Sequence, residues 1–123
     1  MSHVKKRILV VDDEAPVREV LRRFLEQNGY EAVTAESGEA ALQRCRTEPV
    51  DLMLLDMNMP GLTGLDVLVQ LQRIKPSLPV VMLTGNQNDV MAVSSLKLGA
   101  YDYVMKPPDF EYLKLTIQSK LIG

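Results

Sequence analysis

The amino-acid sequence contains short apolar runs, and each of them ends at a polar residue. Residues 8–11, 52–55 and 80–83 are four-residue runs without a polar side chain. Runs of this length, separated by segments with helical periodicity, are typical of buried strands in a parallel sheet. Alternation of such strands with helices favours right-handed crossovers, with helices on both faces of one sheet. The sequence therefore predicts an α/β fold.

Five strand–helix alternations are predicted along the chain. The strands are expected at 7–12, 30–35, 52–55, 80–84 and 102–105, and the helices at 16–28, 37–47, 64–74, 88–98 and 109–121. Residues 30–35 mix apolar and polar side chains, as an edge strand does. In the first helix, an apolar stripe is expected to face the sheet: Val17, Val20, Leu21, Phe24 and Leu25. The last helix is expected to bury Phe110, Leu113 and Ile117.

Length and composition fit a single domain. The 123 residues are 46% hydrophobic, and the net charge of −2 gives no reason to expect nucleic acid as a partner. The apolar runs are far shorter than the roughly 20 residues that cross a bilayer, so no membrane segment is expected. The single cysteine, Cys45, is expected to be a buried thiol and fits a cytoplasmic protein. The basic run at 5–7 is expected to be solvated.

The residues that end the apolar runs carry the chemistry. Asp12 and Asp13 follow the first run, Asp56 ends the third strand, Thr84 ends the fourth, and Lys106 follows the fifth. Parallel strands end at one edge of the sheet, which is where open α/β sheets bind ligands. Carboxylates about 4 Å apart repel by roughly 4 kcal/mol at an effective dielectric constant near 20. A cation is therefore expected among them, and oxygen ligands of this kind suit Mg²⁺.

Each of these residues also has a structural explanation when it is taken alone. Asp12 and Asp13 could cap the helix that starts near Pro16, and residues 56–61 could form only a turn. Thr84 could be an ordinary strand end, and Lys106 a solvated side chain. These explanations give no reason for the residues to meet at one edge, and this convergence favours a functional site.

The order of these motifs resembles the receiver domain of two-component response regulators, the CheY-like family. The matching strings are ILVVDDE at 8–14, LDMNMPG at 55–61, LTG at 83–85 and the Lys106–Pro107 pair. The resemblance extends over about residues 6–121. It implies a doubly wound, flavodoxin-like fold with five parallel strands in the order 2-1-3-4-5. Residues 1–123 are expected to be a single receiver domain without an output domain, excised from a longer protein or acting alone.

The resemblance also implies a metal site and a phosphorylation site. Asp56 corresponds to the aspartate that receives a phosphoryl group. Asp13 and Asp56 are expected to bind Mg²⁺ directly, with Mn²⁺ as an alternative, and the backbone carbonyl of Asn58 is expected to complete the site. Asp12 is expected to act through a metal-bound water.

Further roles carry over from the family to positions around this site. Thr84 and Lys106 correspond to the residues that contact the phosphoryl oxygens, and Tyr103 corresponds to an aromatic switch residue. Pro107 is expected to follow a cis peptide bond, and Pro108 departs from the commonest pattern. Asn58 and Asn86 stand at the positions that influence the lifetime of the phosphoryl group.

The function implied is signalling, with no turnover of an external substrate. A sensor histidine kinase or a phosphotransfer protein would phosphorylate Asp56, and the domain would promote this step and slow dephosphorylation. The face formed by residues 88–98, 102–105 and 109–121 would then bind an effector or a second copy. No direct contact of this domain with nucleic acid or a membrane is expected.

Three other functions would share the fold or the chemistry. An aspartate-nucleophile phosphatase usually has a second aspartate where this chain has Asn58. A nucleotide- or flavin-binding module would need glycines in the loop at residues 13–16, which has none. An interaction domain that works without phosphorylation would be expected to lack at least one pocket residue, and none is missing.

Overall fold

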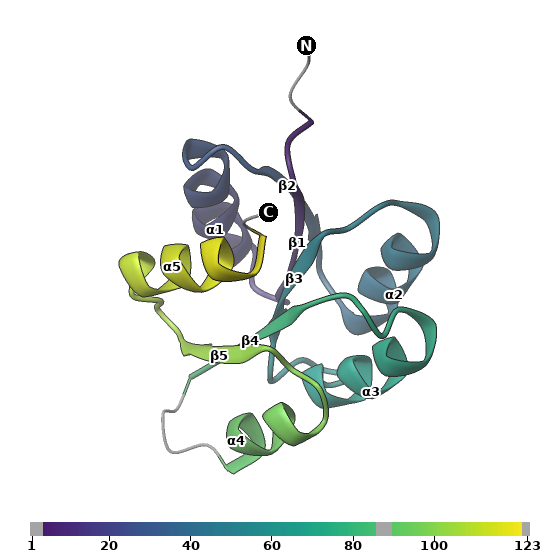
Figure 1. Ribbon diagram of the computed structural model, residues 1–123. Coiled ribbons are helices and arrows are strands. Elements are labelled where there is room, and N and C mark those ends of the chain that lie inside the picture. The colour runs from purple at the N-terminus through teal and green to yellow at the C-terminus, as the bar shows by residue number, and fades with distance from the viewer. Residues whose placement is uncertain (1–3, 86–89, 122–123) are drawn as a thin grey trace.

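The computed structural model describes residues 4–85 and 90–121, in which five strands alternate with five helices (Figure 1). In chain order they are β1 (Arg7–Val11), α1 (Ala15–Gln27), β2 (Glu31–Ala35), α2 (Gly38–Thr47), β3 (Leu52–Asp56), α3 (Gly64–Ile74), β4 (Val80–Thr84), α4 (Val90–Lys97), β5 (Asp102–Met105) and α5 (Phe110–Leu121). The predicted alternation is confirmed. The expected first residues of α4 lie outside the described residues. No helix in the described ranges is long and apolar enough to cross a membrane.

All strand pairs are parallel, and the strand order is β2-β1-β3-β4-β5. The doubly wound fold with order 2-1-3-4-5 is therefore confirmed. The register places Val11 beside both Ala35 and Leu55, and Asp56 beside Leu83. β1, β3 and β4 thus end almost level with one another at the same edge of the sheet.

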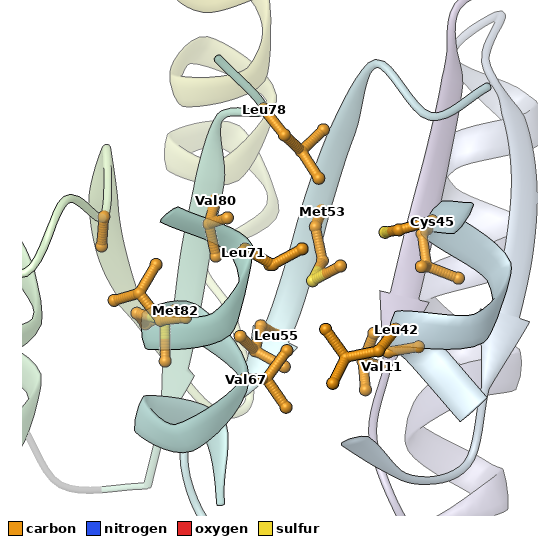
Figure 2. Packing of buried hydrophobic residues seen from close by; sticks show 14 of the residues in the cluster. Val11, Leu42, Cys45, Met53, Leu55, Val67, Leu71, Leu78, Val80 and Met82 are labelled. Atoms are coloured by element: carbon orange, nitrogen blue, oxygen red, sulfur yellow. The ribbon is translucent and has the colours of Figure 1, made fainter. Parts of the chain in front are cut away.

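Each central strand buries side chains on both faces, because successive residues point to opposite sides. Leu9, Met53 and Met82 belong to one core cluster, which α2, α3 and α4 cover (Figure 2). Ile8, Leu54 and Val81 belong to the opposite cluster, which α1 and α5 cover. Cys45 of α2 is fully buried in the first cluster, as expected. This two-sided burial explains why the sequence runs are continuously apolar and do not alternate.

Local sequence signals account for several helix ends. Ser37 caps α2, because its side chain accepts the backbone N–H of Ala40 at 3.1 Å, as predicted. α1 ends at Asn28 and Gly29, and Gly29 has φ = +89°, a conformation that glycine adopts without strain. The capping box of α3, formed by Thr63 and Asp66, was not predicted.

Two side chains that were expected inside the core are exposed. Val20 is 51% exposed and Phe110 is 36% exposed. Leu21 and Leu25 occupy the part of α1 that faces the sheet, and successive helix residues are rotated by about 100°, so Val20 points away from it. Phe110, the first residue of α5, packs instead against Phe24 of α1, with ring centroids 4.8 Å apart. Both residues border a hollow of about 390 Å³ between the two helices.

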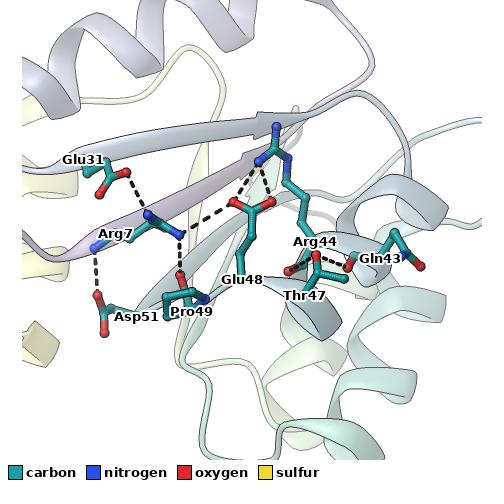
Figure 3. Close-up of polar contacts among 8 residues, drawn as sticks. All are labelled: Arg7, Glu31, Gln43, Arg44, Thr47, Glu48, Pro49 and Asp51. Atoms are coloured by element: carbon teal, nitrogen blue, oxygen red, sulfur yellow. Dashed lines mark hydrogen bonds and ion pairs between the residues drawn. The ribbon is translucent and has the colours of Figure 1, made fainter.

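Arg7 is not the solvated residue that the basic run predicted. Its guanidinium contacts Glu31 Oε1 at 3.0 Å, Glu48 Oε1 at 3.6 Å and the carbonyl oxygen of Pro49 at 3.4 Å (Figure 3). Its backbone N–H donates to Asp51 Oδ2 at 2.7 Å. These contacts join β1, β2 and the α2–β3 loop at the amino edge of the sheet. The partners come from segments distant in sequence, which is why the local charge pattern did not reveal them.

Candidate functional site

The polar residues singled out in the sequence meet at the carboxyl edge of the sheet. Asp12 follows β1, Asp56 and Thr84 are the last residues of β3 and β4, and Lys106 follows β5. Asp12 and Thr84 are fully buried, and Asp56 is 2% exposed. The backbone N–H of Lys106 donates to the carbonyl oxygen of Thr84 at 2.7 Å, which fixes the β5–α5 loop beside the end of β4.

The ammonium of Lys106 lies between two buried carboxylates. Its Nζ atom is 3.0 Å from Asp12 Oδ2 and 3.1 Å from Asp56 Oδ1. A longer contact of 3.9 Å reaches Glu14 Oε1, which the sequence did not identify as part of the site. Since burying a carboxylate without a partner is very costly, Lys106 is the counter-charge that allows Asp12 and Asp56 to lie side by side.

Contacts with several groups hold Asp12. Its Oδ1 accepts the backbone N–H of Glu14 at 2.9 Å, and its carbonyl oxygen accepts Arg18 Nη1 at 2.7 Å. Its own N–H donates to the carbonyl oxygen of Ala35 at 3.2 Å. The residue at the N-cap of α1 is Glu14, and no side chain forms a cap hydrogen bond there. The capping explanation for Asp12 and Asp13 is therefore wrong.

Three carboxylates at this edge form a donor set that could hold a metal ion. One oxygen from each of Asp12, Asp13 and Asp56 lies within 4.8 Å of the others, with Asp13 exposed to solvent. The backbone N–H of Asn58 donates to Asp56 Oδ1 at 3.3 Å, so the loop after β3 also faces this group. Mg²⁺ is usually bound in proteins by one or two carboxylates and several waters, which an open, partly exposed acidic set permits.

The electrostatics of Asp56 reflect this crowding. Burial and the nearby carboxylate of Asp12 raise the pKa of Asp56 to about 6, although Lys106 and the N–H of Asn58 oppose the shift. Burial alone would lower the pKa of Lys106, but its hydrogen bonds to Asp12 and Asp56 outweigh burial and raise that pKa. Above about pH 6 the carboxylate of Asp56 is therefore ionised and can attract a further cation, and the Lys106 ammonium remains charged.

Gly64, the first residue of α3, allows this helix to approach the site closely. A Cβ atom at this position would lie 2.3 Å from the carbonyl oxygen of Asp56 and 2.9 Å from Met57 Cα. The N–H of Gly64 donates to the carbonyl oxygen of Met57 at 3.1 Å. Sequence reasoning missed this role, although a glycine at a helix start is itself a signal of close backbone approach.

Tyr103 and Thr84 lie on the same face of the sheet. Tyr103 pairs with Met82 and packs against the same core cluster, and Thr84 follows Met82 by two residues. Tyr103 is half-buried and borders a hollow of about 380 Å³ together with Asp102 and Tyr112. The Tyr112 hydroxyl donates to Asp102 Oδ2 at 2.8 Å, which joins α5 to β5 at this hollow.

Two predictions remain, on the peptide bond before Pro107 and on Asn86. The peptide bond between Lys106 and Pro107 is cis, the isomer expected from the family resemblance. Asn86 lies outside the described residues.

The chain matches known proteins over most of its length. The family model of the response regulator receiver domain matches residues 8–118. The alkaline phosphatase synthesis transcriptional regulatory protein PhoP of Bacillus subtilis is 43% identical over 104 residues, covering 85% of this chain and 43% of that protein. The phosphate regulon transcriptional regulatory protein PhoB of Escherichia coli is 42% identical over 104 residues, covering 83% of this chain and 45% of that protein. The chain thus spans less than half the length of these two relatives.

Solved structures show the same fold. A response regulator receiver domain protein from Clostridium thermocellum has a TM-score of 0.89 and 32% identity, with 94% of each chain covered. The response regulator protein TrrA from Thermotoga maritima, in complex with Mg²⁺-BeF, has a TM-score of 0.86 and 40% identity. That match covers 94% of this chain and 99% of the other.

Proposed function

Because this chain belongs to the response regulator receiver domain family, we propose that it accepts a phosphoryl group on Asp56 in two-component signalling. The observation that carries this proposal is the pair of buried carboxylates, Asp12 and Asp56, held by the single ammonium of Lys106 at the carboxyl edge of the sheet. A purely structural site would gain little from burying two like charges together, since each such charge opposes folding.

In the proposed reaction, a carboxylate oxygen of Asp56 attacks the phosphorus atom of the donor. The new bond joins this oxygen to phosphorus, and the bond to the leaving group breaks. The leaving group is the ring nitrogen of a phosphohistidine or the acetate of acetyl phosphate, and it keeps the bonding electron pair. Asp56 becomes an acyl phosphate. Lys106 and the hydroxyl of Thr84 would stabilise the negative charge on the phosphoryl oxygens.

Asp13 and Asp56 would bind Mg²⁺ or Mn²⁺ directly, with the backbone carbonyl of Asn58, and Asp12 would act through a bound water. The metal would supply neutralisation of charge between the carboxylates and the incoming phosphoryl group. The closeness of the three carboxylates supports this assignment. So does the Mg²⁺-BeF complex of the TrrA protein, because the match covers 94% of this chain and 99% of that one.

Phosphorylation would be transmitted through Thr84 and Tyr103. A phosphoryl group on Asp56 would draw the Thr84 hydroxyl towards it, and Tyr103 would rotate inward on the same face of the sheet. The output surface proposed is the α4–β5–α5 face. The helices α4 and α5 and the loop between α4 and β5 carry exposed apolar side chains: Val90, Val93, Leu96, Leu98, Tyr101, Tyr112 and Leu115. Phosphorylation would act only through its different free energies of interaction with the two states.

The partners follow from this assignment. A sensor histidine kinase or a phosphotransfer protein would supply the phosphoryl group in the cytoplasm, and an effector or a second copy would bind the α4–β5–α5 face. PhoP and PhoB are transcriptional regulators more than twice as long as the match. We therefore assign any contact with DNA to a separate output domain and none to this one.

Mass spectrometry after incubation with acetyl phosphate and Mg²⁺ tests the proposal. The intact mass should rise by one phosphoryl group, and Asp56→Asn should abolish the increase. Asp51→Asn, at the opposite edge of the sheet, should leave it unchanged. Unchanged labelling of Asp56→Asn would refute the assignment. Absence of labelling in the wild type would favour an interaction domain that works without phosphorylation.

A further inference from the structure

Arg18 contacts the backbone of the loop between β1 and α1, whereas Lys106 contacts the side chain of Asp12. The Nη1 atom of Arg18 donates to the carbonyl oxygen of Asp12 at 2.7 Å, reaching back from the first turns of α1. Resting on the proposed function, we propose that Arg18 is a positioning residue that fixes Asp12 and Asp13 in the arrangement that binds the metal ion.

Asp12 depends on side chains for part of its orientation. Lys106 binds its carboxylate at 3.0 Å, and Arg18 binds its backbone carbonyl. In the proposed phosphorylated state, Lys106 contacts the phosphoryl group, so its bond to Asp12 weakens or breaks. The Arg18 bond engages only the backbone and is independent of what the carboxylates bind. Arg18 can therefore keep the loop in place when Lys106 is redirected.

The direction of the change in Mg²⁺ affinity on replacing Arg18 distinguishes a positioning role from a purely electrostatic one. The guanidinium is a cation next to an acidic site, so its charge alone opposes the binding of Mg²⁺. Removal of the charge would then strengthen binding if Arg18 acted only electrostatically. Loss of positioning has the opposite sign, because ligands that are not held lose metal affinity. Partners of this outer kind typically contribute about 10- to 100-fold to metal affinity.

The test is Mg²⁺ affinity by isothermal titration calorimetry on the whole chain, with the free energy of unfolding measured alongside. Arg18→Met removes the donor and keeps an apolar stem, and Arg18→Lys keeps the charge and a donor. Arg23→Met is the matched control, because Arg23 lies on the same helix, is largely exposed and pairs with Glu19. We expect Arg18→Met to weaken binding by about tenfold, Arg18→Lys to recover part of this loss, and Arg23→Met to match the wild type.

The outcomes are distinct for the two proposals. Equal or tighter Mg²⁺ binding by Arg18→Met overturns the role of Arg18, and so does an equal loss in Arg23→Met. Failure of the wild type to bind Mg²⁺ overturns the metal site itself, and with it the inference. Weaker binding that appears in Arg18→Met without a matching change in Arg23→Met supports positioning, since a general loss of helix stability would affect both variants.

Discussion

The Nζ atom of Lys106 lies 3.1 Å from Oδ1 of Asp56, joining the β5–α5 loop to the end of β3. Lys106 also binds Asp12, so one cation serves two carboxylates that are both almost fully buried. Excess negative charge in a buried place opposes folding. The residues that suit this edge to phosphoryl transfer are therefore expected to lower the stability of the metal-free protein.

Asp56→Asn should stabilise the metal-free protein at neutral pH. The folded-state pKa of Asp56 is raised to about 6 by burial and Asp12, whereas an unfolded aspartate titrates near 3.9. The folded state thus binds this proton more tightly, and the contribution of Asp56 to stability falls as the pH rises from about 4 to about 6. The variant avoids this loss, so its free energy of unfolding should exceed that of the wild type by about 3 kcal/mol at pH 7.5.

Urea denaturation in EDTA at pH 4 and pH 7.5 measures this difference. The free energies of unfolding of Asp56→Asn and the wild type should become nearly equal at pH 4. Glu36→Gln removes an exposed carboxylate and should have the stability of the wild type at both pH values. A variant less stable than the wild type at pH 7.5 would contradict the prediction.

Asp13→Ala should weaken Mg²⁺ binding by at least about tenfold, because it removes one of two direct anionic ligands from a site whose other ligands are mostly water. Glu14→Gln is the control, since Glu14 is an exposed neighbour that is not expected to bind the metal. It should change the affinity by less than about threefold, as expected for an exposed charge. Calorimetric titration gives both affinities, and equal values for Asp13→Ala and the wild type would remove Asp13 from the metal site.

Thr84→Ala should still be phosphorylated on Asp56 but should transmit the change poorly. The hydroxyl is the group expected to move towards the phosphoryl group, whereas the nucleophile, the metal ligands and Lys106 remain. Nuclear magnetic resonance of the Tyr103 ring, before and after acetyl phosphate, reports the switch. Thr84→Ser keeps the hydroxyl and should behave as the wild type. A full shift of Tyr103 in Thr84→Ala would mean that the signal leaves the site by another route.

Gly64→Ala should destabilise the fold by about 1–3 kcal/mol, as overpacking of a close contact does. The added methyl group would lie 2.3 Å from the carbonyl oxygen of Asp56, so α3 or Asp56 must move. Gly85→Ala is the matched control, because among the described residues other than its chain neighbour no atom lies within 4 Å of a Cβ there. Chemical denaturation gives the free energy of unfolding of both variants. Equal values would show that α3 can move away from Asp56 without loss of stability.

The strands and the convergence of polar residues were predictable because both follow from local patterns. The run Ile8 to Val11 is apolar throughout, since both faces of β1 are covered, and Asp12 comes where that run stops. The side of a helix that a neighbour covers was harder to predict. Val20 belongs to the apolar stripe of α1, yet its side chain points away from the sheet and is exposed.

Contacts between distant segments were not predictable from either pattern. Arg7 looks like part of a solvated basic run, and only the fold brings Glu31 and Glu48 to it. Arg18 likewise looks like an ordinary helix residue, and its contact with the carbonyl of Asp12 depends on the turn between them. The site residues could be identified from short sequence motifs. The groups that hold them in place could not, because those contacts form only when distant parts of the chain come together.

Because Cys45 is buried in the core under α2, the labelling of its thiol can measure how often this part of the protein opens. Cys45 is the single cysteine of the chain, it has no exposed surface, and burial raises the pKa of its thiol. A thiol reagent can therefore reach it only when α2 separates from the sheet, and each adduct records one such event. The rate of labelling should be measured with and without Mg²⁺ or acetyl phosphate. A difference would show that metal binding or phosphorylation at the carboxyl edge changes how often α2 separates from the sheet.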